Sequence, residues 1–107
     1  MNISESQKIF MELQNKINKA EKSKQPIEHF VKQQIKILES IHDSFSKTSK
    51  SNTIQEHIAI SETKIKQLYV IINLCKKIGL PTNKYEEKIR QIRIKDLGAE
   101  FVKQNFN

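Results

Sequence analysis

The chain has 107 residues, of which 36% are hydrophobic, and it carries a net charge of +7. This length fits one small domain, and the longest apolar run, residues 68–72, is far shorter than the roughly 20 residues of a membrane span. The first ten residues show no basic stretch followed by an apolar one, so we expect no secretory signal. A single cysteine, Cys75, cannot form an internal disulfide, which also favours a cytoplasmic protein.

Sparse helix breakers and helical spacing predict an all-α fold. Only two glycines and two prolines interrupt the chain. The first helix is expected at residues 4–22, where Ser4 and Gln7 have the spacing of a capping box. The second is expected at residues 26–46, with Pro26 at its first position. The apolar stripes are Phe10, Leu13, Ile17 and Ala20 in the first helix, and Ile27, Phe30, Val31, Ile35, Leu38, Ile41 and Phe45 in the second.

The third predicted helix, residues 53–78, carries two apolar faces. It follows "SKTSKSN", residues 46–52, which has no large apolar side chain and is expected to form an exposed loop. Thr53 and Glu56 make a second capping-box pattern. Two faces predict contact with more than one neighbouring helix, so this helix should be central. The faces are Ile58, Ser61, Ile65, Leu68, Ile72 and Cys75 on one side, and Ile71, Leu74 and Ile78 on the other.

A turn is predicted after the third helix. Gly79 can adopt the left-handed conformation that ends a helix, and Pro81 prevents its continuation. Thr82 or Asn83 is placed to cap a fourth helix at residues 83–94. The side chains expected to face inward from this helix are Tyr85, Ile89 and Ile92.

These elements predict an antiparallel up-down four-helix bundle in residues 1–98. The short links after the first and third helices make those neighbours antiparallel hairpins. Gly98 separates the bundle from residues 99–107, which are expected to form a tail or a short helical turn. We expect a monomer, and no internal repeat is evident.

Residue patterns typical of catalysis or metal binding are missing from the sequence. The three histidines, His29, His42 and His57, have no close ligand spacing, so neither a metal nor a cofactor is expected. Glu86 and Glu87 are adjacent and point in different directions, which makes a poor acid–base pair. Cys75 lies on an apolar face, where a small buried hydrophobe is expected rather than a nucleophile. We therefore predict a protein that is not an enzyme.

The positive charge is concentrated toward the C-terminus. Residues 76–107 hold eight basic and four acidic side chains, and Lys84, Lys88 and Lys95 are expected near one helical face, beside Arg90 and Arg93. An anionic membrane surface is one partner that such charge favours. Nucleic acid is not expected as a specific partner, because only two of the 19 basic residues are arginine. Any binding to DNA should be weak and salt-dependent.

The segment "LYVIINLCKKIGLPTNKYEEKIRQIRI", residues 68–94, resembles the last helical hairpin of the pediocin-like (class IIa) bacteriocin immunity proteins. That family has a long apolar helix with an aromatic residue, a basic pair, an aliphatic residue, a turn with proline or threonine, and an acidic first turn. In this sequence those features fall on Tyr69, on Lys76 and Lys77, on Ile78, on Pro81 and Thr82, and on Glu86 and Glu87. Leu80 stands where the family often has phenylalanine, and "KIKQLY" replaces an Asn-Arg-Leu signature of some subgroups.

The resemblance implies a cytosolic immunity protein that protects a producer cell from a pore-forming bacteriocin. Its partner would be the membrane permease receptor, or the complex of receptor and bacteriocin, reached at the inner face of the membrane. The residues expected to bind this partner are Lys76, Lys77, Lys84, Lys88, Arg90, Arg93, Lys95, Phe101 and Phe106. A second function class fits the composition as well, namely a small basic helical adaptor of phage or plasmid type that binds a host protein or nucleic acid.

Overall fold

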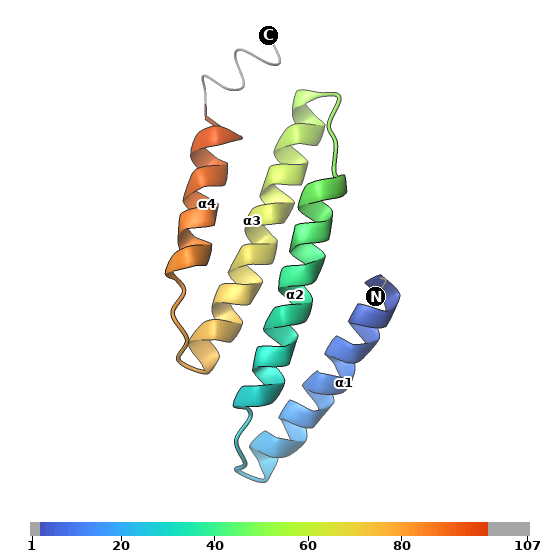
Figure 1. The fold of residues 1–107 in the computed structure, drawn as a ribbon, viewed down its shortest axis with the longest axis vertical. Helices are drawn as coiled ribbons and strands as arrows, with labels where there is room; N and C mark the ends of the chain where they lie inside the picture. Colours follow the sequence, from blue (N-terminus) through green and yellow to red (C-terminus); the bar gives the residue numbers. More distant parts are fainter. Residues whose placement is uncertain (1–2, 99–107) are drawn as a thin grey trace.

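The computed structural model describes residues 3–98, in which four helices and no strand are found. The helices are α1 (Ile3–Lys22), α2 (Glu28–Thr48), α3 (Ile54–Lys77) and α4 (Asn83–Lys95) (Figure 1). The all-α four-helix prediction is confirmed, and each observed boundary lies within two residues of the predicted one. Within the described residues, none of these helices has the length and apolarity that a bilayer crossing requires. The predicted tail, residues 99–107, lies outside the described residues.

Consecutive helices are antiparallel and lie side by side, with α1 and α4 at opposite edges (Figure 1). The main packing contacts join α1 to α2, α2 to α3, and α3 to α4. The α1–α2 turn and the α3–α4 turn lie at one end of the molecule, and the α2–α3 link lies at the other (Figure 1). Each edge helix therefore has one main neighbour, whereas α2 and α3 have two.

The core is centred on α3. Leu68 and Ile71, which belong to the two predicted apolar faces of this helix, are both buried, with 1% and 0% of their surface exposed. The prediction of a central third helix with two buried faces is confirmed. The buried core cluster comprises Ile17, Val31, Ile35, Ile65, Leu68, Ile71, Ile72, Cys75, Tyr85 and Ile89.

Three local predictions in the first half of the chain are wrong. Ser4 lies inside α1, which begins at Ile3, so it cannot be the capping residue. Pro26 is not the first residue of α2. It lies in the turn after α1, and the next residue, Ile27, is the N-cap of α2. The predicted loop at residues 46–52 is shorter, since α2 continues to Thr48, whose hydroxyl donates to the Ser44 carbonyl.

The two later caps differ from each other. Thr53 Oγ1 accepts a hydrogen bond from the Glu56 backbone N–H at 3.1 Å, which confirms the predicted N-cap of α3. The Glu56 carboxylate accepts from the backbone N–H of Asn52 at 2.9 Å. Thr82 holds the N-cap position of α4, but its side chain makes no capping bond. Its hydroxyl donates instead to the Glu86 carboxylate at 3.0 Å.

The turn between α1 and α2 is a Schellman motif. The Gln25 N–H donates to the Ala20 carbonyl at 2.8 Å, and the Lys24 N–H donates to the Glu21 carbonyl at 3.1 Å. Lys24 has a φ of 58°, in the left-handed region that an L-residue with a side chain adopts at a cost. The end of α1 therefore has the backbone geometry usually associated with glycine, although the residue in this position is Lys24.

The turn between α3 and α4 has the same motif. The Leu80 N–H donates to the Cys75 carbonyl at 2.9 Å, and the Gly79 N–H donates to the Lys76 carbonyl at 3.3 Å. Gly79 has a φ of 72°, so the predicted left-handed end of the third helix is confirmed.

The two hairpins repeat one arrangement of turn and buried positions, although no internal repeat was evident in the sequence. Equivalent turn residues are Lys24 and Gly79, Gln25 and Leu80, Pro26 and Pro81, and Ile27 and Thr82, at a constant offset of 55 positions. The N-caps of α2 and α4 even share a φ of −114°. The same offset pairs buried positions along the helices, namely Ser6 and Ser61, Leu13 and Leu68, Ile17 and Ile72, Ala20 and Cys75, and Gln34 and Ile89.

Candidate functional site

A shallow groove between α3 and α4, here called the outer groove, gathers aromatic, apolar and basic side chains. Its cavity volume is about 430 Å³. Tyr69 and Ile94 remain 43% and 56% exposed, so the groove presents aromatic and aliphatic surface to solvent. The lining residues are Tyr69, Ile72, Asn73, Lys76, Glu86, Ile89, Arg90, Arg93 and Ile94.

Arg93 is held in the outer groove by Tyr69. Its guanidinium donates from Nη2 to the Tyr69 hydroxyl at 3.1 Å, and its Cζ lies 5.9 Å from the centre of the Tyr69 ring. A cation at this distance from an aromatic ring is attracted by the ring quadrupole. The contact therefore keeps a positive charge beside an exposed aromatic ring, on neighbouring helices.

Arg90 forms an ion pair within its own helix. Its Nε donates to Glu87 Oε2 at 2.9 Å, and Gln91 donates to the same carboxylate at 2.8 Å. Hydrogen bonding from Arg90, and next from Gln91, lowers the pKa of Glu87 from its ordinary value of 4.5 to about 2. Arg90 therefore brings less uncompensated charge to the groove than Arg93 does.

The predicted lysine face of α4 does not have Arg93 beside it in the structure. Lys84 reaches across to α2, where its Nζ lies 3.7 Å from a carboxylate oxygen of Glu39. Lys88 lines a hollow on the same side, together with His42 of α2. Arg93 lies in the outer groove, on the other side of α4. The nine positions from Lys84 to Arg93 correspond to two and a half helical turns, so these two side chains leave opposite sides of α4.

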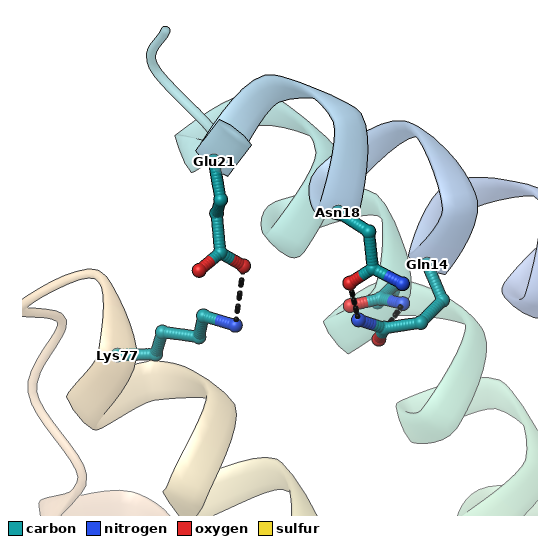
Figure 2. Close-up of polar contacts among 5 residues, drawn as sticks. Gln14, Asn18, Glu21 and Lys77 are labelled. Carbon is teal, nitrogen blue, oxygen red and sulfur yellow. Dashed lines mark hydrogen bonds and ion pairs between the residues drawn. The ribbon is translucent and has the colours of Figure 1, made fainter. Parts of the chain in front are cut away.

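The basic pair at the end of α3 is also divided. Lys76 lines the outer groove, whereas Lys77 points toward the end of α1 and pairs with Glu21 at 3.1 Å (Figure 2). Lys95 is exposed, in the last turn of α4. Phe101 and Phe106 lie outside the described residues. Of the nine predicted partner-binding residues, the outer groove thus brings together Lys76, Arg90 and Arg93.

Two buried titratable side chains, His42 and Cys75, lie in contacts between helices. His42 Nδ1 lies 2.7 Å from Gln67 Oε1, which links α2 to α3. Burial raises the pKa of the Cys75 thiol, so this cysteine is a poor nucleophile. Residues 3–98 contain no cluster of three or more His, Cys, Asp or Glu side chains that could hold a metal ion.

The sequence did not reveal the contacts between helices at this site. The Tyr69–Arg93 contact and the Lys84–Glu39 pair join residues far apart in the chain, and neither pair has a recognisable spacing. The placement of Lys84 and Arg93 on opposite sides of α4 could have been predicted from the sequence, because residue spacing fixes the angle between side chains around a helix.

Comparisons of the chain with protein-family models, with curated proteins and with solved structures find no match.

Proposed function

We propose that this protein is a non-catalytic immunity protein that acts in the cytosol and protects its cell from a pore-forming bacteriocin. The observation that carries the proposal is the outer groove, where exposed Tyr69 and Ile94 lie beside Lys76 and Arg93. Exposed aromatic side chains and arginine are the residue types that dominate protein interfaces. The groove also lies on the hairpin that resembles the immunity family.

In this proposal the partner is the membrane permease receptor, or its complex with the bacteriocin. Positive charge on the α3–α4 hairpin attracts the protein to the anionic inner face of the membrane. Tyr69 and Ile94 then provide the apolar contact, and Arg93 provides hydrogen-bond donors for a carboxylate or carbonyl on the partner. Charge speeds the encounter, whereas the apolar contact sets the lifetime of the complex.

The charge pattern supports a protein partner over nucleic acid. Lys77, Lys84 and Arg90 are each paired with a carboxylate, on Glu21, Glu39 and Glu87. The remaining basic side chains of α4 lie on two sides of the helix, so they do not form the continuous stripe that follows a phosphate backbone.

The test is expression of the full chain in the cytosol of a bacteriocin-sensitive strain, challenged with a panel of class IIa peptides. We expect resistance to one peptide. Tyr69→Ala and Arg93→Ala should each reduce that resistance by at least about ten-fold, since truncating a central interface residue costs about 2 kcal/mol.

Matched controls lie on α1. Lys16→Ala removes one positive charge from an exposed position, and Met11→Ala removes one exposed apolar side chain. Both should retain full protection. If the chain protects against no peptide in the panel, or if the α1 variants lose as much protection as the groove variants, the proposal is wrong.

The C-terminal segment gives a second test of the same proposal. Phe101 and Phe106 are the apolar side chains of this segment that we expect to bind the partner, and the predicted apolar stripes of the helices end by Ile94. Deleting residues 99–107 should therefore abolish protection while the helix content measured by circular dichroism stays unchanged. Full protection by the truncated chain would remove this segment from the proposed interface.

A further inference from the structure

A second cavity, here called the joint pocket, lies between α2 and the α3–α4 turn. Its volume is about 560 Å³, within the range of about 300–1,000 Å³ typical of small-molecule sites. Ile35 and Tyr85, which are 5% and 3% exposed, form part of its lining, together with Leu80 and Pro81 of the turn. The pocket is thus lined by an apolar surface that the fold already holds in place.

The pocket depends on a difference between the two repeats. Leu80 lines it from the third position of the α3–α4 turn, where the α1–α2 turn has Gln25. Cys75, which also lines it, is equivalent to Ala20 in the first hairpin. The two turns share a backbone motif, but the side chains that face this cavity from the second turn are more apolar than their equivalents in the first.

Lysines from two helices surround the apolar surface. Lys32 pairs with Glu28 at 3.1 Å, and Lys84 pairs with Glu39 at 3.7 Å. Lys36 lines the pocket as well, and within residues 3–98 it has no ion-pair partner. Two of the three ammonium groups are thus compensated, and one positive charge remains for a ligand.

We propose that the joint pocket binds a small amphiphile with an apolar body and a single carboxylate head, of which a fatty acid is the simplest form. The apolar body lies against Ile35, Leu80 and Tyr85. The carboxylate accepts hydrogen bonds from Lys36. The single uncompensated charge favours a monoanion, because the second negative charge of a dianion would have no unpaired cation beside it in the pocket. This site is separate from the outer groove and does not depend on the proposed immunity function.

The probe is dodecanoate, kept below its critical micelle concentration and titrated into the ¹⁵N-labelled full chain. We expect saturable binding of one molecule, with NMR shift changes concentrated at Ile35, Leu80 and Tyr85. Dodecyltrimethylammonium has the same chain and the opposite charge, so it should bind more weakly by about five-fold or more.

Two variants test the two parts of the site. Lys36→Met keeps the aliphatic stem and should weaken dodecanoate binding by about five-fold, whereas Lys16→Met on α1 should leave it unchanged. Leu80→Gln places in the second turn the residue that the first turn already carries at Gln25, so the backbone hydrogen bonds of the turn should be retained. This variant should weaken binding by about ten-fold.

Three results would overturn the proposal. The first is equal affinity for dodecanoate and the ammonium probe. The second is a set of NMR shift changes centred on the outer groove or on α1. The third is unchanged dodecanoate affinity in both Lys36→Met and Leu80→Gln.

Discussion

The two hairpins are built on one backbone plan, but their turns and interfaces carry different side chains. Both turns are Schellman motifs that are followed by a proline. In the first turn the left-handed position is Lys24, and in the second it is Gly79. The repeats thus share the hydrogen bonds of the turn and the proline after it, but not the residue in the left-handed position.

The interfaces within the hairpins differ in polarity as well. Gln34 of α2 is fully buried, and its amide Nε2 donates to the Phe10 carbonyl at 3.4 Å and to Gln14 Oε1 at 3.2 Å. Gln14 in turn donates to Asn18 at 3.1 Å (Figure 2). The equivalent position in the second hairpin is Ile89, in the apolar core. The α1–α2 interface thus includes a buried polar contact at a position where the α3–α4 interface is apolar.

The largest expected effect compares Leu68 with its equivalent, Leu13. Leu68→Ala should lower the free energy of unfolding by about 2–5 kcal/mol, because it leaves a cavity in the central core. Leu13→Ala should cost less, since Leu13 lies on an edge helix and is 4% rather than 1% exposed. Urea denaturation of both variants measures the difference. An equal or larger loss for Leu13→Ala would mean that α1 is as firmly packed as α3.

The next effect concerns the left-handed turn residues. Gly79→Ala should destabilise the protein by about 1 kcal/mol, because a side chain at positive φ is strained. Apart from Gly79 and its two chain neighbours, no described residue has an atom within 4 Å of the Cβ that this change adds, so the loss comes from the backbone conformation. Lys24→Gly should do the opposite and stabilise the first hairpin by up to about 1 kcal/mol. Thermal unfolding of the two variants checks whether the signs are opposite.

A smaller effect is expected for the buried amide. Among residues 3–98, Gln34 Oε1 has no hydrogen-bond partner, which is costly in a buried site. Gln34→Leu gives the α1–α2 interface an apolar side chain at the position equivalent to Ile89 in the α3–α4 interface. It should change the free energy of unfolding by less than about 1 kcal/mol, in the stabilising direction, since removal of the unpaired acceptor offsets the two lost hydrogen bonds. A loss well above that size in chemical denaturation would show that the amide network holds α1 in place.

The smallest effect is electrostatic and belongs to the second hairpin. The pKa of Glu87 is lowered to about 2 in the folded protein, so its contribution to stability is present above pH 4.5 and is lost as pH falls toward 2. Because both partners are exposed, the change in stability should be slight. Titration of the Glu87 carboxyl carbon by NMR gives the folded pKa directly. In Arg90→Ala this pKa should rise toward 4.5, and no rise would contradict the ion pair.

Much of the fold was predictable because helix periodicity and helix breakers are local signals. Gly79 identified the second turn correctly. The equivalent first turn was harder to predict, because Lys24 occupies a conformation that the sequence would assign to glycine. The repeat was hard to predict for the same reason, and because pairs such as Gln34 and Ile89 share a buried position without sharing chemistry.

The candidate site was less predictable than the fold. The residues of the outer groove come from two helices, and their association depends on how α3 and α4 face each other. Lys77 and Lys84 appeared to be free basic side chains in the sequence, but they pair with carboxylates on α1 and α2. These ion pairs join residues that are far apart in the chain, so composition and residue spacing cannot predict them.

The pairing of each helix mainly with its neighbour in the chain has a consequence for how the protein folds. Low contact order is associated with folding in microseconds to milliseconds, because short loops close at little entropic cost. During synthesis, the first hairpin can form before the second leaves the ribosome. The second hairpin then adds to α2, an assembled surface, so the chain is expected to acquire its structure in steps of one hairpin at a time.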